Sequence, residues 1–263
     1  RRFWPKDIDL RAFQDGPRDD TDLNDAAVFE RRFGRMPAAH GIKGKGVNYR
    51  YQAVKFARKV FVETDPAFRP TNGWLIWLDA DIHTFAPVSH ETLAAACPVG
   101  KAISYLGRKE WDHSECSFIG YNMENPVAHA FLDRLRWYYT SGMIFSLAQW
   151  HDSYVFDQVR VEFAPMAHLF HNISEGIPGE HVFPRTILGT CMDHLKGPVR
   201  KRLGRSPERT EQCSDTISFD SLLSSLSLVP SAKSEPGTAS GRSSSVRKPS
   251  NTKKRSSTSG STS

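Results

Sequence analysis

The sequence predicts an α/β fold in which helices flank a largely parallel or mixed sheet. Short apolar runs of strand length alternate along the chain with longer segments that repeat their apolar residues at helical spacing. The roughly 200 residues before the Ser-rich C-terminal segment contain enough aliphatic and aromatic side chains for one well-buried core. Strands that alternate with helices indicate a sheet covered by helices.

The expected elements follow one another in order. Apolar residues at helical spacing indicate a helix over 47–62, and the apolar run Trp74–Leu78 indicates a buried strand after a Pro/Asn/Gly turn. The remaining expected elements are a helix at 89–96 capped by Ser89, strands at 101–106 and 117–121, helices at 126–139 and 150–161, and a late strand at 186–191.

The C-terminal segment 206–263 differs in composition from the rest of the chain. It contains Ser runs, basic residues and a single aromatic residue, Phe219. Such a segment buries too little apolar surface to offset its chain entropy, so we expect a disordered, basic, Ser-rich tail. The net charge of +6 equals the six cations of residues 236–263, which hold no acid. The rest of the chain is therefore neutral, and nucleic acid is not an expected partner.

Cysteine usage and hydropathy bear on the compartment. The four cysteines show no CxxC spacing, which argues against a disulfide framework or a zinc knuckle and predicts reduced thiols in a cytoplasmic protein. We expect no membrane span, because the most apolar run, Trp74–Leu78, is far shorter than the roughly 20 residues that cross a bilayer. Any targeting segment would precede Arg1.

Two carboxylates, Asp79 and Asp81, follow the apolar run directly. In an extended chain, residues two apart lie on the same side, where like charges repel unless a cation lies beside them. Carboxylate oxygens suit Mn²⁺ or Mg²⁺, and ligands bind at the carboxyl ends of strands in open α/β sheets. The pair therefore predicts a metal site. The alternative interpretation is a solvated turn that ends the strand.

Two later segments carry further candidate residues. Near the end of the expected fold, His194 offers an imidazole ligand, Lys196 and Arg200 offer charge for a phosphate, and Gly197 permits close backbone approach. Asp152 lies at an expected helix N-terminus, where a carboxylate either caps the helix or serves as a general base.

Together these motifs resemble nucleotide-sugar glycosyltransferases of the GT-A type, which have a Rossmann-like fold. The resemblance is closest to a small family found in bacteria and large algal viruses, and more distant to glycogenin-like enzymes. It is carried by YRYQAVKF at 49–56, WLDAD at 77–81, SECSFIGYN at 114–122, WHDS at 150–153 and DHLKG at 193–197. His194 and Gly197 match a His-x-x-Gly-x-x-Lys pattern in which Arg200 stands for the Lys.

The resemblance implies a fold, a reaction and partners. It covers 1–205, where we expect an N-terminally truncated GT-A domain that lacks its first strand. It implies transfer of a sugar from a nucleotide-diphosphate sugar, most simply a UDP-sugar, to a glycan or other hydroxyl acceptor, with Mn²⁺ or Mg²⁺ as cofactor.

The resemblance also implies roles for individual residues. Asp81 and His194 would ligate the metal, and Asp79 would do so through water or hold the ribose. Lys196 or Arg200 would meet the phosphates, and Asp152 would take the acceptor proton if the enzyme inverts the configuration of the anomeric carbon. Arg50 would reach the nucleotide, and Glu115 would bind sugar hydroxyls.

Two alternatives remain open at this level. A haloacid-dehalogenase-like phosphatase also places an Asp-x-Asp after an apolar strand, with the first Asp as nucleophile. The other alternative is a non-catalytic, degenerate scaffold that acts through its basic tail.

Overall fold

The computed structural model describes residues 1–13, 25–109 and 113–209. The chain divides into two units, residues 1–217 and 218–263, and the second unit lies wholly outside the described residues. The predicted tail at 206–263 is therefore described only as far as Arg209. Within that short stretch Ser206 is buried against the folded body.

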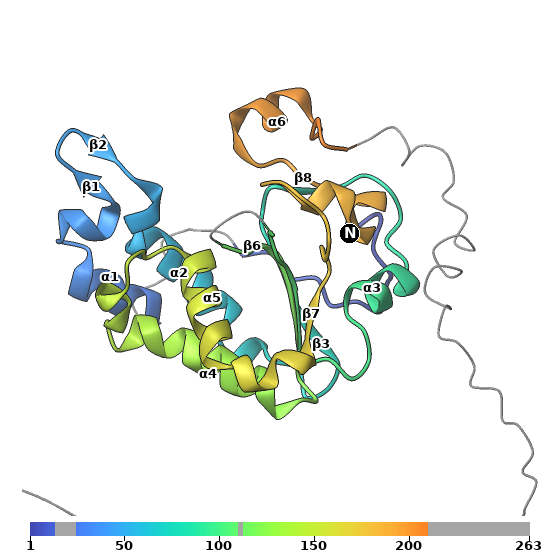
Figure 1. Ribbon diagram of the computed structural model, residues 1–263, viewed down its shortest axis with the longest axis horizontal. Helices are drawn as coiled ribbons and strands as arrows, with labels where there is room; N and C mark the ends of the chain where they lie inside the picture. The colour runs from blue at the N-terminus through green and yellow to red at the C-terminus, as the bar shows by residue number, and fades with distance from the viewer. Residues whose placement is uncertain (14–24, 110–112, 210–263) are drawn as a thin grey trace, which may run out of the picture. The chain divides into compact units, whose positions relative to one another are not determined.

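A four-stranded mixed sheet forms the centre of the first unit (Figure 1). Its strand order is β3 (Trp74–Leu78), β6 (Glu115–Asn122), β5 (Ile103–Leu106) and β7 (Phe170–Asn172). Strand β6 is antiparallel to β3 and β5, whereas β5 and β7 are parallel. The expectation of an α/β fold with a mixed sheet flanked by helices is confirmed.

Two small two-stranded sheets accompany the central one. Strands β1 (Ile42–Lys43) and β2 (Gly46–Val47) form a hairpin. Strand β4 (Ile82–Thr84) pairs antiparallel with β8 (Met192–His194), which joins the segment after β3 to a segment more than one hundred residues later.

Helices cover both faces of the central sheet (Figure 1). On one side lie α1 (Asp25–Phe33), α2 (Ala53–Glu63), α4 (Pro126–Thr140) and α5 (Asp152–Glu162); on the other lies α3 (His90–Ala96). One hydrophobic core lies on each face of the sheet, and β3 contributes to both because its side chains alternate. Leu75 and Trp77 pack into the core beside α1, α2, α4 and α5, and Trp74, Ile76 and Leu78 pack into the core beside α3. No helix among the described residues has the length and apolar character needed to cross a bilayer.

The short elements complete the first unit. Helix α6 (Gly197–Leu203) follows β8. Short 3₁₀ helices occupy Pro37–His40, Tyr49–Tyr51, Pro66–Phe68, Met143–Ser146, Ala164–Leu169, Phe183–Arg185 and Ile187–Thr190.

Two expected elements differ from the structure. The helix expected from residue 47 begins at Ala53, because the Asn48 side chain accepts from the Arg50 amide and starts a 3₁₀ turn instead. The strand expected at 186–191 is wrong: the Thr186 hydroxyl accepts from the Leu188 amide and starts a 3₁₀ turn, and the strand begins only at Met192. Side-chain capping by Asn and Thr competes with regular structure at both places.

The carboxyl ends of β3, β5 and β7 and the amino end of β6 lie together at one edge of the central sheet. Because β6 runs antiparallel to its neighbours, its amino end lies beside the carboxyl ends of β3 and β5. The parallel strand β7 brings its carboxyl end to the same edge.

Candidate functional site

The carboxylates of Asp79 and Asp81 lie on a tight turn at the end of β3. The amide of Ile82 donates to the carbonyl of Asp79 at 3.0 Å, which closes the turn. The chain then enters β4, which pairs with β8 so that Ile82 faces His194, and the Leu195 amide donates to the Asp81 carbonyl at 3.0 Å. Ligand atoms of Asp79, Asp81 and His194 all lie within 4.8 Å of one another. The three residues meet as expected, but through a turn and a strand pairing instead of extended alternation.

Glu115 fixes the ring of His194 from behind. Its Oε1 lies 2.7 Å from His194 Nδ1, and its Oε2 accepts from the Val182 amide at 3.2 Å. His181 Nδ1 lies 3.1 Å from the same Oε1, without the alignment of a hydrogen bond. His194 Nε2 is thereby directed toward Asp81, 3.1 Å from Oδ1. A carboxylate behind an imidazole is the usual arrangement that orients a metal-binding histidine.

The role expected for Glu115 at sugar hydroxyls does not fit this position. Glu115 is only 3% exposed, and its two oxygens are taken by buried protein groups. A carboxylate buried this deeply among imidazoles positions its neighbours and does not reach a substrate. The sequence alone gave no signal for this contact, because Glu115 and His194 are far apart in the chain.

Opposite charges favour the charged forms of Glu115, His194 and Asp81, so a metal ion that binds His194 Nε2 would displace a proton from it. Burial favours the neutral form of Glu115, but the His181 and His194 imidazoles outweigh burial and hold the pKa of Glu115 well below its ordinary value. Burial likewise opposes the charged form of His194, but Asp81 and Glu115 raise the pKa of its imidazole to about 9. The hydrogen bond from His194, together with Lys201, lowers the pKa of Asp81 far below the ordinary range.

Lys59 is a residue of the site that the sequence did not reveal. From α2 its ammonium reaches three acceptors: Asp79 Oδ1 at 2.8 Å, Asp152 Oδ2 at 2.7 Å and the Cys116 carbonyl at 2.6 Å. An ammonium has three donors, so all are used. Burial opposes the charge of Lys59, but the surrounding carboxylates raise its pKa well above the ordinary value. In the sequence it looks like any lysine of an amphipathic helix.

Asp152 is buried at the first position of α5. The cap of that helix is His151, whose Nδ1 accepts from the Tyr154 amide, so Asp152 is not the N-cap. Burial would raise the pKa of Asp152, but the Lys59 ammonium outweighs burial and keeps that pKa below its ordinary value. Asp152 is therefore an ionised acceptor whose basicity its lysine partner restrains.

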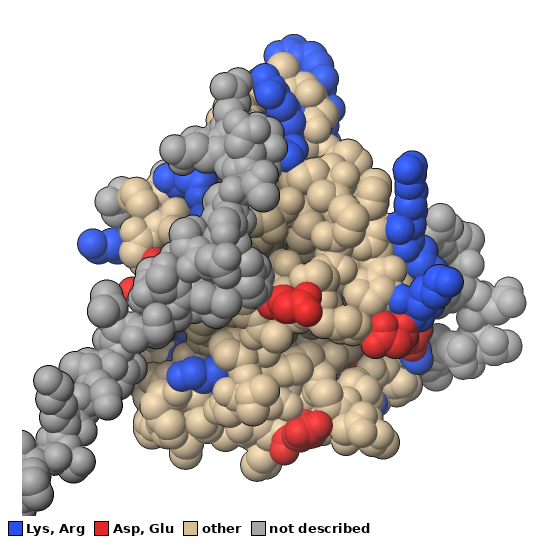
Figure 2. Space-filling view, turned by 90° about the vertical axis from the view of Figure 1, so that its right-hand side faces the viewer, with Lys and Arg blue, Asp and Glu red and all other residues tan. Residues whose placement is uncertain are grey.

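The basic segment after β8 lies next to the carboxylates, with one change from expectation. Lys201 is the cation that reaches Asp81, 3.1 Å from Oδ2. Arg200 is instead held by Glu208, and Lys196 lies 3.6 Å from Glu180. Gly197 takes a φ of +80° at the start of α6, a conformation that favours glycine. Figure 2 shows Lys and Arg side chains at the top of the molecule, where Figure 1 places α6.

Arg50 lies exposed in the 3₁₀ turn Tyr49–Tyr51. Its carbonyl accepts from the Trp150 amide at 2.7 Å, which fixes that turn against the segment leading into α5. The structure thus places the turn that holds Arg50 beside the amino end of α5, which begins at Asp152.

The donor set at this edge fits a divalent cation. Two carboxylates on a turn supply hard oxygens, and an imidazole anchored through its other nitrogen supplies the third ligand. The neighbouring group of Glu115, His181 and His194 is a second set with converging ligand atoms, but all three residues are buried. No family model, curated protein or solved structure matches this chain.

Proposed function

We propose that the protein is a metal-dependent glycosyltransferase that uses a nucleotide-diphosphate sugar, with a UDP-sugar as the first candidate donor. The observation that carries the proposal is the convergence of Asp79, Asp81 and His194 beside a basic helix at one sheet edge. The resemblance to GT-A enzymes in the same motifs supports it. Mn²⁺ or Mg²⁺ bound there would neutralise the leaving diphosphate.

The residues divide into ligands and supports. Asp81 and His194 bind the metal, and Asp79 contributes through water or holds the ribose. Glu115 keeps Nε2 of His194 directed at the site. Lys201, the cation nearest to Asp81, joins Lys196 as a partner for the diphosphate. Gly197 leaves the backbone open at that point, since no atom lies within 4 Å of where a Cβ would stand.

The proposed reaction balances with these groups. A bond forms between the acceptor oxygen and the anomeric carbon, and the bond between that carbon and the diphosphate oxygen breaks. The diphosphate leaves with the electron pair, and the acceptor hydroxyl loses its proton. In this proposal the proton goes to Asp152, which Lys59 at 2.7 Å keeps ionised. Retention and inversion of the anomeric carbon both satisfy this balance.

Calorimetric titration of the full chain with UDP tests the proposal. We expect UDP to bind in the presence of Mn²⁺, binding to disappear with EDTA, and Asp81→Asn to abolish it. Asp133→Asn is the matched control, because Asp133 is an exposed aspartate of α4 paired with Arg69. Full Mn²⁺-dependent binding in Asp81→Asn would contradict the site. Phosphate release from p-nitrophenyl phosphate without UDP binding would favour the phosphatase alternative. The absence of both UDP binding and phosphate release would favour a non-catalytic scaffold.

A further inference from the structure

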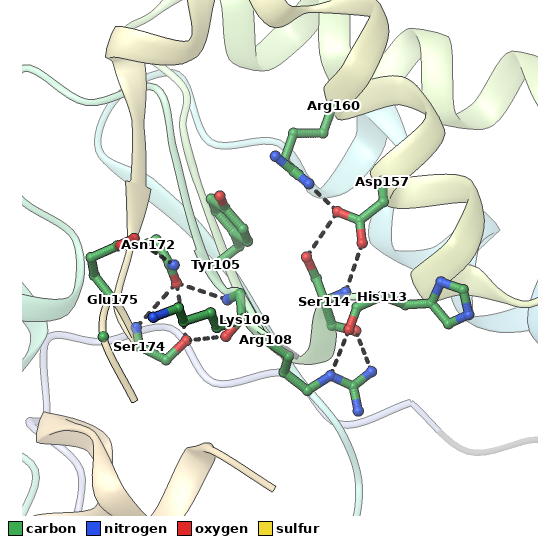
Figure 3. A pocket seen from close by; sticks show the side chains of 12 residues that line it. Tyr105, Arg108, Lys109, His113, Ser114, Asp157, Arg160, Asn172, Ser174 and Glu175 are labelled. Carbon is green, nitrogen blue, oxygen red and sulfur yellow. Dashed lines mark hydrogen bonds and ion pairs between the residues drawn. The ribbon is translucent and has the colours of Figure 1, made fainter. Parts of the chain in front are cut away.

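A pocket opens at the same sheet edge as the donor set, on the side of β5 and β7 (Figure 3). Its volume is about 210 Å³, below the roughly 300–1,000 Å³ of sites for drug-sized ligands, so it suits a group about the size of one sugar ring. Side chains from α5, from the end of β7 and the residues after it, and from residues 105–109 and 113–114 surround it. None of these residues belongs to the donor set of Asp79, Asp81 and His194.

One wall of the pocket is built by Asn172 at the end of β7. Its Oδ1 accepts from the Gly107 amide at 2.8 Å, and its Nδ2 donates to Glu175 at 2.9 Å. The Ser174 hydroxyl donates to the Gly107 carbonyl at 2.5 Å. A Cβ on Gly107 would stand 2.7 Å from the Asn172 amide, so Asn172 would have to leave its present position to admit any larger residue. These three hydrogen bonds hold the wall together without any ligand.

The opposite wall is held by Asp157 of α5. Its Oδ2 accepts from the Ser114 amide at 2.6 Å, and its Oδ1 accepts from the Ser114 hydroxyl and from Arg160 Nε, both at 2.8 Å. Three backbone carbonyls accept from the Arg108 guanidinium, at His113, Ser114 and Glu180. Arg108 is thus fixed in place by neutral groups that do not cancel its charge.

The pocket carries an excess of positive charge. Three cations, Arg108, Lys109 and Arg160, line it with two carboxylates, Asp157 and Glu175. Arg160 is paired with Asp157, and Glu175 accepts from an amide. Lys109 is exposed and forms no ion pair with a carboxylate of the described residues. An anionic group would be attracted there, while the Tyr105 and Asn172 side chains offer polar partners for hydroxyls.

The pocket adjoins the proposed metal site through two elements. Ser114 directly precedes Glu115, which holds His194 at 2.7 Å. Asp157 lies five residues after Asp152 on α5, about 7.5 Å along the helix axis. Residues five apart project from different faces of a helix, so an acceptor anchored in the pocket would have to extend out of it to bring a hydroxyl to Asp152.

We propose that this pocket binds the anionic group, carboxylate or phosphate, of a small sugar-like acceptor whose hydroxyl is directed toward Asp152. The acceptor role rests on the proposed glycosyl transfer, in which that hydroxyl loses its proton and bonds to the anomeric carbon. Binding of an anionic sugar in the pocket does not depend on that function. The two statements can therefore fail separately.

Ligand-observed NMR titration of the full chain, without UDP or metal, tests the binding. The probes are D-glucuronate, D-glucose 6-phosphate, D-glucose and inorganic phosphate. We expect one of the two anionic sugars to bind at least about tenfold more tightly than glucose and than phosphate, as one charge-assisted contact allows. The tighter of the two identifies carboxylate or phosphate as the group recognised.

Variants of Lys109 locate the site. Lys109→Ala should weaken the anionic sugar about tenfold, and Lys109→Glu should weaken it further, whereas Lys45→Ala in the β1–β2 turn should leave it unchanged. Equal affinity for glucose and both anionic sugars, no binding of any probe, or binding unchanged in Lys109→Glu would each overturn the pocket proposal. If the protein binds an anionic sugar in a Lys109-dependent way but shows no Mn²⁺-dependent UDP binding, the pocket proposal stands and its acceptor role is overturned.

Discussion

Replacing Lys59 tests the electrostatic account of the site most severely. Lys59→Met keeps much of the side-chain length but removes the ammonium that neutralises Asp79 and Asp152 at 2.8 and 2.7 Å. At an effective dielectric constant near 20, each contact has a Coulomb energy of about 6 kcal/mol. Desolvation of the lysine, whose side chain is only 14% exposed, offsets most of this energy. The net loss of unfolding free energy should be about 3–5 kcal/mol, the range for breaking a buried ion pair.

Urea denaturation of the full chain, followed by tryptophan fluorescence, measures this loss. Lys55→Met, on the exposed side of the same helix, is the matched control and should change stability by no more than about 0.5 kcal/mol. Adding Asp152→Asn to Lys59→Met should recover at least about 1 kcal/mol, because one stranded carboxylate is then neutral. A loss below about 1 kcal/mol in Lys59→Met would refute the reasoning, since the two carboxylates would then need no buried counter-charge.

Three further predictions concern other parts of the fold. Burial raises the pKa of Glu63 from 4.5 to about 7, so the folded protein holds this proton more tightly than the unfolded chain. Stability from this group therefore falls by about 3 kcal/mol as pH rises from 4.5 to 7. The urea midpoint of Glu63→Gln relative to that of the wild type should therefore rise between pH 5 and pH 8. A difference between the two midpoints that does not change with pH would count against this. Gly107→Ala should lower the free energy of unfolding by about 1–3 kcal/mol, because the new methyl group overlaps Asn172. Gly46→Ala, with open space around it, should be nearly neutral. Thermal melting compares the two variants, and equal melting temperatures would contradict the close approach. Ser206→Ala removes two buried hydrogen bonds and should cost about 1–2 kcal/mol in the same assay, whereas an unchanged melting temperature would show that residue 206 lies outside the fold.

The strongly periodic segments were predictable from sequence. The apolar run Trp74–Leu78 is a strand, and Pro126 and Ser89 begin helices as expected. These features depend on local chemistry: apolar alternation, a proline in the first turn and a hydroxyl that caps. The helix start expected at residue 47 and the strand expected at 186–191 were wrong, because the short polar side chains of Asn48 and Thr186 bond to nearby amides and favour 3₁₀ turns.

The site was predictable only where one segment carries it. Asp79 and Asp81 follow a strand, and His194 with its basic neighbours marks a second segment, so the donor set could be anticipated. Glu115 and Lys59 act through contacts across the fold, with His194 and with Asp79 and Asp152, and no local pattern reveals them. The choice of Lys201 over Arg200 depends on which face of α6 turns toward Asp81, and a short basic helix does not disclose that from sequence.

The central claim is that Asp79, Asp81 and His194 bind a divalent cation, and titration with Mn²⁺ followed by electron paramagnetic resonance tests it directly. Free Mn²⁺ gives a strong signal that weakens when the ion binds protein, so the affinity is read without any substrate. The account predicts one bound Mn²⁺ per chain, lost in Asp81→Asn and in His194→Ala and retained in Asp133→Asn. Stoichiometric binding that survives both site variants, or no binding to the wild-type chain, would contradict it.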